Sequence, residues 1–453
     1  MPKKTTQDLS DPRLLRLVIR LGVPAILGLS ANAINQFIDA LWITQLSPAA
    51  MASIGITFPL IVVATAATAG IGVATAGEIG RRLGRKDKVG AEAVALTAFI
   101  TALSLAVIVG SCLLLTAGAS LPLVGASAET LPMAKVYLTI LLCALPIATF
   151  QIISDFVALG SGNSSRSMQT LIACFGLNIV LDPIFIFGFG WGVAGAAMAT
   201  IAGQVLACTI YMIWFRRGTL GLRPMRGALE RKHIMNLLRF APPITLVNLL
   251  TALSFLILVG AIARLADDMY VAALTFDLRL VSLIIIPIQG LALGAQAAVS
   301  HAHGAGDHLR ANRLIHCIFA LSTGLGGTLT AIILLAASFL FPIMIPAAGM
   351  QHAAVGMFPF FAAFIIGSCA YIPLLSGFQA TDRALFAAIV ALAPNGYVML
   401  PLIILLPLFW GISGLLWAVA FSGAITALIA GLLHAIVLSR SSEIVTGAPA
   451  DTA

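Results

Sequence analysis

The amino-acid sequence predicts an all-α integral membrane protein, with twelve transmembrane helices in two six-helix lobes. The first observation is composition: the 453-residue chain is 60% hydrophobic and only 9% charged, whereas soluble domains carry roughly 25% charged residues. The second is that its apolar stretches are continuous, without the alternation of period two that marks barrel strands. The third is their length, because a helix needs about 20 apolar residues to cross ~30 Å of hydrocarbon. Soluble enzymes, disordered scaffolds and disulfide-rich secreted modules are thereby excluded.

Twelve apolar segments follow one another along the chain, and each is long enough for one crossing. In order, they lie near residues 17–43, 51–77, 89–117, 131–157, 166–187, 193–215, 238–264, 271–297, 311–337, 352–378, 384–408 and 412–438. The first six are expected to form an N-terminal lobe at 17–215, and the last six a C-terminal lobe at 238–438. The polar residues 216–237 are the expected cytoplasmic linker, and the expected cytoplasmic tails are residues 1–16 and 439–453.

The basic residues predict how the chain is oriented. An even number of crossings places both termini on the same side. With the N-terminus inside, 22 of the 25 Lys and Arg residues fall at the inner face, and only Lys135, Arg264 and Arg279 do not. The positive-inside rule therefore predicts a multi-pass membrane protein with both termini in the cytoplasm. The expected location is the inner membrane of a prokaryote. The net charge of +8 is divided among short loops, which argues against nucleic-acid binding.

The second half of the chain repeats features of the first about 220 residues later. The stretch 24–38 starts at a proline and is rich in asparagine, and it has a counterpart at 243–257. Gly84, which precedes a basic run, matches Gly304. Six helices per half make the halves parallel repeats, related by an axis along the membrane normal. Two such bundles would enclose the central cleft that alternating access requires. The alternative is that duplication built a larger channel or scaffold.

Ionisable side chains within a bilayer are costly, and by default they indicate function. The clearest acids inside the predicted crossings are Asp39, Asp182 and Asp277. Asp39 and Asp182 lie eight and six residues before the outer ends of their helices. At 1.5 Å per residue, both are ~9–12 Å below the outer surface. The sequence therefore predicts two carboxylates at one depth in the N-terminal lobe.

Two neutral residues are expected at the same level as these carboxylates. Asn178 stands one helical turn before Asp182 on the same face, and Thr200 reaches a similar depth on the following helix. Hard cations prefer oxygen ligands, and all four side chains carry one. Two carboxylates in a low dielectric repel each other, so one should hold a proton or a cation. The set is predicted to be a cation-coupling site for Na⁺ or H⁺. The alternative is a polar cluster that only holds helices together.

Several runs of sequence carry a resemblance to a known family. The run QFIDALWI at 36–43 resembles the first-helix signature of the multidrug and toxic compound extrusion (MATE) family. LNIVLDPIFI at 177–186 and WGVAGAAMAT at 191–200 are similar to further parts of that family, and EIGRRLGR at 78–85 resembles its second-to-third-helix loop. The resemblance covers about residues 15–440. It implies a cation-driven exporter of amphipathic, often cationic, drugs. The positions that match the family's N-terminal-lobe cation site are Asp39, Asn178, Asp182 and Thr200.

The chain also departs from the common family pattern. Many members carry acids in the seventh and tenth crossings, whereas residues 242–263 and 357–378 contain none here. The pattern is closest to the DNA-damage-inducible-protein-F-like branch, which relies on the N-terminal lobe. The resemblance therefore implies that one lobe carries the coupling chemistry.

Six residues are candidates for lining a substrate cavity: Asn35, Gln36, Phe150, Gln151, Asp277 and Arg279. Asn35 stands one turn before Asp39, where relatives often have Tyr. Asp277 and Arg279 are two residues apart, so they do not face each other on a helix. A structural role weighs evenly against a functional one for that pair. Phe and Gln at helical spacing are more often core or lipid-facing residues.

These observations together predict a secondary active multidrug exporter that antiports Na⁺ or H⁺ against amphipathic or cationic compounds by alternating access. No enzyme activity and no cofactor are expected, and no GxxxxGK[ST] motif for an ATP motor occurs. The expected partners are small substrates and membrane lipids, and the chain is expected to be a monomer. One alternative is a flippase for lipid-linked saccharides. A remoter one is an intramembrane aspartyl enzyme built on Asp39 and Asp182.

Overall fold

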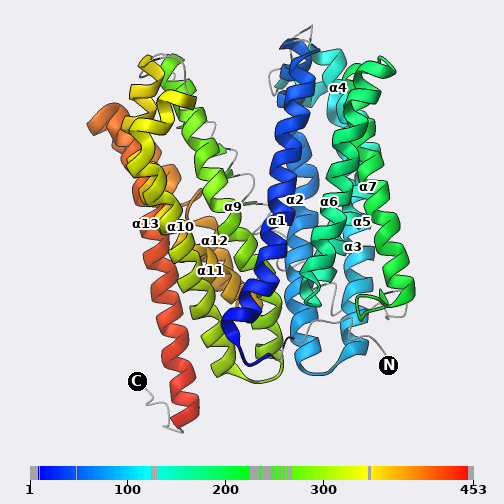
Figure 1. Cartoon of the computed structure of the whole chain (residues 1–453), viewed down its shortest axis with the longest axis vertical. Coiled ribbons are helices and arrows are strands. Elements are labelled where there is room, and N and C mark those ends of the chain that lie inside the picture. Colours follow the sequence, from blue (N-terminus) through cyan, green and yellow to red (C-terminus); the bar gives the residue numbers. More distant parts are fainter. Residues whose placement is uncertain are drawn as a thin grey trace. The chain divides into compact units, whose positions relative to one another are not determined.

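The structure is a computed structural model and is entirely helical over the residues it describes (Figure 1). These are residues 9, 11–46, 48–123, 126, 128, 130–224, 268–344 and 348–446, with scattered positions between 235 and 265. Within them, nine helices are long and apolar enough to cross a membrane, or ten if one bent pair counts as a single span. The seventh predicted segment, 238–264, falls mostly outside the described residues.

The helices follow the order of the predicted segments. In the first half they are α1 (Leu14–Thr44), α2 (Pro48–Gly84), α3 (Lys88–Leu123), α4 (Thr130–Cys143), α5 (Leu145–Gly160), α6 (Ser164–Pro183), the π-helical turn η1 (Ile184–Gly188) and α7 (Gly192–Arg217). In the second half they are α9 (Asp268–Gly304), α10 (His308–Met344), α11 (Ala348–Ala380), α12 (Ala384–Leu392) and α13 (Met399–Thr446). The predicted all-α class is confirmed.

Helix breakers shape three of the predicted segments. The fourth is bent by 53° between α4 and α5, two residues before Pro146, because proline removes a backbone donor. The eleventh was predicted to be one helix, but it is interrupted by a turn at 393–398 that contains Pro394 and Gly396. The eleventh and twelfth segments are joined in α13, whose backbone is non-helical at Gly411, with φ 55° and ψ −132°.

The chain divides into two compact units. Unit 1 comprises Met1–Leu249, Leu293–Leu314 and Gln379–Asp382, and unit 2 comprises Leu250–Ala292, Ile315–Phe378 and Arg383–Ala453. Unit 1 therefore includes the N-terminal helices and also the residues around the turns that follow α9 and α11.

The helices of unit 1 pack in a way that sets up two sites. In Figure 1, α1 to α7 run up and down beside one another. α6 packs between α1 and α7, whereas α2 packs chiefly on α3 and α5. A buried cluster joins α2, α3, α5 and α7, with Ile71, Ala98, Ile153 and Tyr211 all fully buried. Large apolar side chains such as Leu115 remain exposed on the outer faces, as expected of helices that meet lipid. The α1–α6 interface carries Asp39, Asn178 and Asp182, three of the four candidate coupling residues.

Candidate functional site

Two matching pairs of residues form the centre of the candidate site. On α1, the Asn35 side-chain amide donates to Asp39 Oδ2 at 3.0 Å. On α6, the Asn178 side-chain amide donates to Asp182 Oδ1 at 3.1 Å. In both helices the amide stands four residues before the acid, so it reaches the carboxylate along one face. Each helix therefore brings its carboxylate together with an amide.

The two pairs meet across the α1–α6 interface. The carboxyl groups of Asp39 and Asp182 lie within hydrogen-bonding reach of each other. Asn35, Asn178 and Asp182 are at most 5% exposed, whereas Asp39 is half-buried. Two like-charged groups this close together in a poorly solvated site are unfavourable unless a cation or proton lies between them. The structure thus brings both predicted acids and Asn178 together.

Four oxygen atoms of this cluster are buried and receive no hydrogen bond from any described residue. They are Asn35 Oδ1, Asp39 Oδ1, Asn178 Oδ1 and Asp182 Oδ2. Buried polar atoms are normally hydrogen-bonded, so four unpartnered acceptors in one place require an explanation. Because they are all oxygens of carboxylates or amides, the set suits a hard monovalent cation or a proton. We call these four residues the acid–amide cluster.

The fourth predicted residue, Thr200, lies on α7, which packs against α6. Its hydroxyl donates to the Ala196 carbonyl of its own helix at 3.0 Å, so its proton is occupied and its oxygen keeps acceptor capacity. No described hydrogen bond joins it to the acid–amide cluster.

Tyr137, which lies on α4, was not predicted from the sequence to be near the acids. Tyr137 is within electrostatic range of both Asp39 and Asp182 and packs on the apolar cluster around Ile43 and Ile186. No motif singled it out, because a single Tyr in an apolar helix carries no signal of its own. Asn35 was predicted to line a substrate cavity. It stands four residues before Asp39, as Asn178 does before Asp182.

The local sequence explains how Asp182 comes to lie at a helix end. Pro183 follows it directly, and the next five residues form the π-helical turn η1. Such turns are rare and are frequent at functional sites. Gly195 lets α7 return tightly over this turn, because a Cβ there would lie 2.6 Å from the Phe185 carbonyl oxygen. The segments containing Asp182 and Thr200 are thus placed by a proline and a glycine.

The remaining cavity candidates in unit 1 lie elsewhere. Gln36 is exposed and donates to Asn32 Oδ1 at 3.1 Å along α1. Phe150 stacks on Phe99 at 4.9 Å between ring centroids. Gln151 is 6% exposed, and its side-chain oxygen lies 3.9 Å from the sulfur of a cysteine on α6. The structure shows no interaction of these three with the acid–amide cluster.

Asp277 stands out in unit 2. It lies on α9 and is fully buried, and neither of its carboxylate oxygens receives a hydrogen bond from a described residue. A buried carboxylate without a partner is costly, so the site favours a proton or a cationic ligand. The side chain of Arg279 lies outside the described residues.

Another carboxylate, Asp155, lies near the end of α5 in unit 1. Its Oδ1 accepts hydrogen bonds from Ser167 at 2.9 Å, from Thr170 at 3.3 Å and from the Tyr211 hydroxyl. The donors come from α6 and α7, so one carboxylate ties three helices together. This arrangement is structural in character, because the hydrogen bonds are provided internally.

A polar network joins the ends of α2 and α11 at one end of unit 1, where basic residues gather. Arg81 pairs with Glu78 at 2.8 Å and donates to the Gln379 and Ala380 carbonyls at 3.3 and 3.2 Å. Arg82 pairs with the other oxygen of Glu78 at 2.9 Å. The Arg81 side chain is only 6% exposed. We call this the basic end of unit 1, and the charge count predicts that it is cytoplasmic.

The MatE family model matches two stretches of the chain, residues 24–184 and 243–405. The chain belongs to the MatE family. The two matches begin about 220 residues apart, which agrees with an internal repeat of the length predicted from the sequence. This MATE transporter is thus a multi-pass membrane protein.

Several relatives resemble this MATE transporter over nearly its whole length. Multidrug export protein MepA of Staphylococcus aureus (strain NCTC 8325) is 24% identical over 453 residues, covering 95% of this chain and 97% of that protein. A crystal structure of MATE in the bent conformation has a TM-score of 0.89 at 24% identity and covers 95% of this chain and 98% of that one. An outward-facing multidrug resistance MATE family transporter has a TM-score of 0.88 at 24% identity, covering 94% and 96%. The likeness establishes the two-lobe fold.

Proposed function

We propose that this MATE transporter exports amphipathic or cationic compounds from the cell in exchange for Na⁺ or H⁺. The observation that carries the proposal is the acid–amide cluster. Two acids and two amides there place four buried oxygens without a hydrogen-bond partner at one site. Relatives named multidrug export proteins support the export of small compounds. No ATP-binding motif occurs in the chain, so an ion gradient is the proposed source of energy.

The cluster links ion binding to helix packing. Asp39 and Asp182 lie on different helices, and with both ionised they repel across the α1–α6 interface. One bound Na⁺ or one proton removes that repulsion and draws the two helices together. The π-helical turn after Asp182 provides a segment that can adjust when the ion arrives. Ion occupancy can therefore bias the unit between two packings, as alternating access requires.

Movement of one charge through the membrane potential supplies ~2.3 kcal/mol per 100 mV. That is sufficient to concentrate a neutral compound roughly fortyfold, because 1.4 kcal/mol corresponds to a factor of ten. One ion per neutral substrate is thus enough for useful accumulation outside. A monovalent cation exchanged one for one moves no net charge, so its export depends on the concentration gradient of the coupling ion.

The basic end provides the contacts that an alternating cycle has to break. The Arg81 side chain joins α2 to the carbonyls at the end of α11. Gly84 and Gly304 bring α2 and α9 into backbone contact, since a Cβ at either position would lie about 2 Å from a carbonyl oxygen of the other helix. We propose that these contacts close the cytoplasmic side while the ion site is open to the outside.

Asp277 is the proposed counter-charge for cationic substrates. It is fully buried without a described partner, and a cationic ligand would neutralise it. A neutral substrate would gain nothing from this carboxylate, so Asp277 discriminates by charge.

The test is transport by the purified full-length protein in proteoliposomes. A fluorescent organic cation is loaded, and its exchange is followed under an imposed Na⁺ gradient at fixed pH, and separately under a pH gradient without Na⁺. Asp39→Asn and Asp182→Asn are each expected to abolish gradient-driven exchange while leaving the amount of folded protein unchanged. Asp307→Asn, an exposed acid that caps α10 through the Arg310 amide, is the matched control.

The outcomes separate the two ions. If Na⁺ is the coupling ion, exchange follows the Na⁺ gradient and weakens as pH falls, because protons then occupy the same carboxylates. If H⁺ is the coupling ion, exchange follows the pH gradient alone. Wild-type exchange in both acid variants, or turnover without any gradient, would overturn the proposal.

A further inference from the structure

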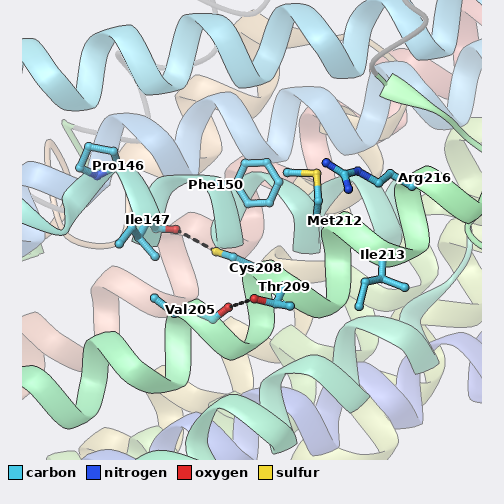
Figure 2. Close-up of a pocket in the computed structure, with 9 residues that line it drawn as sticks. All are labelled: Pro146, Ile147, Phe150, Val205, Cys208, Thr209, Met212, Ile213 and Arg216. Carbon is cyan, nitrogen blue, oxygen red and sulfur yellow. Dashed lines mark hydrogen bonds between the residues drawn. The ribbon is translucent and has the colours of Figure 1, made fainter.

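A groove runs along unit 1 between α5 and α7, and none of its lining residues belongs to the acid–amide cluster. Its volume is about 530 Å³, within the range of small-molecule sites. Figure 2 shows its lining, which consists of three residues of α5 and six of α7. They are Pro146, Ile147, Phe150, Val205, Cys208, Thr209, Met212, Ile213 and Arg216.

The polar atoms of the walls are already satisfied within the protein. The Cys208 sulfhydryl donates to the Ile147 carbonyl at 3.4 Å, and the Thr209 hydroxyl donates to the Val205 carbonyl at 2.8 Å (Figure 2). Arg216 is therefore the one lining residue whose polar side chain has no hydrogen bond among the described residues. An apolar chain can fill it without leaving a donor or acceptor unpaired.

The groove is part of the fold rather than a chance gap between side chains. The 53° bend between α4 and α5 lies beside Pro146, where α5 begins. Phe150 is held against the core by stacking on Phe99, which packs edge-on against Phe215. A wall fixed by an aromatic cluster keeps its shape before any ligand arrives, and this lowers the ordering cost of binding.

Arg216 gives the groove a charged end. It lies in the last turn of α7 and is exposed, and the described residues offer it no ion pair. In Figure 2 its side chain lies at the opposite end of the view from Pro146. From Val205 to Arg216, α7 rises roughly 16 Å at 1.5 Å per residue. That length matches one leaflet of a bilayer with ~30 Å of hydrocarbon.

We propose that this groove binds one anionic phospholipid of the leaflet at the basic end. Its acyl chain lies along α5 and α7, and its phosphate pairs with Arg216. Guanidinium groups form charge-assisted hydrogen bonds with phosphate, and basic pockets between membrane helices at the cytoplasmic side suit anionic headgroups. A cationic drug would be repelled by Arg216, so the groove is not a route for cationic substrates. The site is independent of the coupling chemistry.

The test is lipid binding to the purified full-length protein, measured by native mass spectrometry. The probes are phosphatidylglycerol and phosphatidylcholine with identical acyl chains. The wild type is expected to retain phosphatidylglycerol preferentially. Arg216→Ala is expected to weaken that binding about fivefold. Arg217→Ala is the matched control, because its residue has the same charge and is next in the chain but does not line the groove.

A second pair of variants tests whether the apolar walls of the groove contact the acyl chain. Val205→Trp places a larger side chain at the apolar end of the groove and is expected to reduce binding of both lipids. Met198→Trp, a partly exposed position on the same helix outside the groove, should leave binding unchanged. The proposal is overturned if Arg216→Ala and Arg217→Ala weaken binding equally, since that would indicate diffuse surface charge. It is also overturned if Val205→Trp binds like the wild type or if glycerol phosphate competes fully. Should Arg216→Ala fail to fold, Arg216→Gln and Val205→Trp carry the test.

Discussion

Replacing Gly84 by Ala tests whether the close approach of α2 and α9 holds the basic end together. A Cβ at Gly84 would lie 2.0 Å from the His301 carbonyl oxygen, whereas ordinary van der Waals contact begins at 3.4 Å. The helices would therefore have to separate by about 1.4 Å at this point. The contacted atom belongs to the backbone, so no side chain can turn away to make room. Overpacking of this kind costs about 1–3 kcal/mol.

The loss of stability expected for Gly84→Ala is opposite in sign to the usual effect of replacing Gly by Ala in a helix. Within a helix, Ala is normally favoured over Gly by about 1 kcal/mol. Gly324→Ala in α10 is the matched control, because no atom lies within 4 Å of its Cβ position. The reciprocal variant is Gly304→Ala, whose Cβ would lie 1.9 Å from the Arg81 carbonyl oxygen.

The assay is thermal unfolding of the purified protein in detergent, followed by transport in proteoliposomes. Gly84→Ala and Gly304→Ala are both expected to lower the unfolding midpoint and to slow exchange, since the contacts that close the basic end form less readily. Gly324→Ala is expected to keep or raise the midpoint. If Gly84→Ala were as stable and as active as Gly324→Ala, the close contact would have no energetic weight and the reasoning would be wrong.

Three further predictions follow from the described contacts. Glu78→Gln removes the carboxylate that faces the nearly buried Arg81, and it is expected to lower stability by about 1–3 kcal/mol in the same unfolding assay; an unchanged midpoint would show that the pair contributes nothing. Tyr211→Phe removes one of three donors to the buried Asp155, with an expected loss of about 1–2 kcal/mol, and a stability equal to wild type would contradict the proposed helix tie. Asp277→Asn is expected to reduce transport of an organic cation while sparing a neutral compound of similar size, and an equal loss for both would refute discrimination by charge.

Much of the acid–amide cluster follows from sequence because helices convert spacing into geometry. An amide four residues before an acid lies on the same helix face, so the contact between Asn178 and Asp182 was predictable. The same rule applied to Asn35 and Asp39 would have placed Asn35 in the cluster rather than in a substrate cavity. The position of Tyr137 near Asp39 and Asp182 was not predictable, because it depends on how α4 packs against other helices.

The contacts at the basic end of unit 1 could not be predicted from the sequence. Glu78, Arg81 and Arg82 are visible in the sequence as a basic run with one acid. The acceptors of Arg81, the carbonyls of Gln379 and Ala380, are nearly 300 residues away in the chain. No local pattern marks a carbonyl as a partner, since every residue has one. The apolar groove between α5 and α7 was likewise invisible, because it arises from a bend and from where two helices diverge.

The sequence alone determined the membrane class, the order of the helices and the two acids that meet in the N-terminal half. These depend on apolar segment length, on charge placement and on helical periodicity, and all three act over a few turns of one chain segment. Only the tertiary structure decided that Tyr137 lies near the acids, that Arg81 ties α2 to α11 and that α5 and α7 leave a groove ending at Arg216. These features arise where separate helices touch, and the distances between helices are set by the packing of the whole unit rather than by any one stretch of residues.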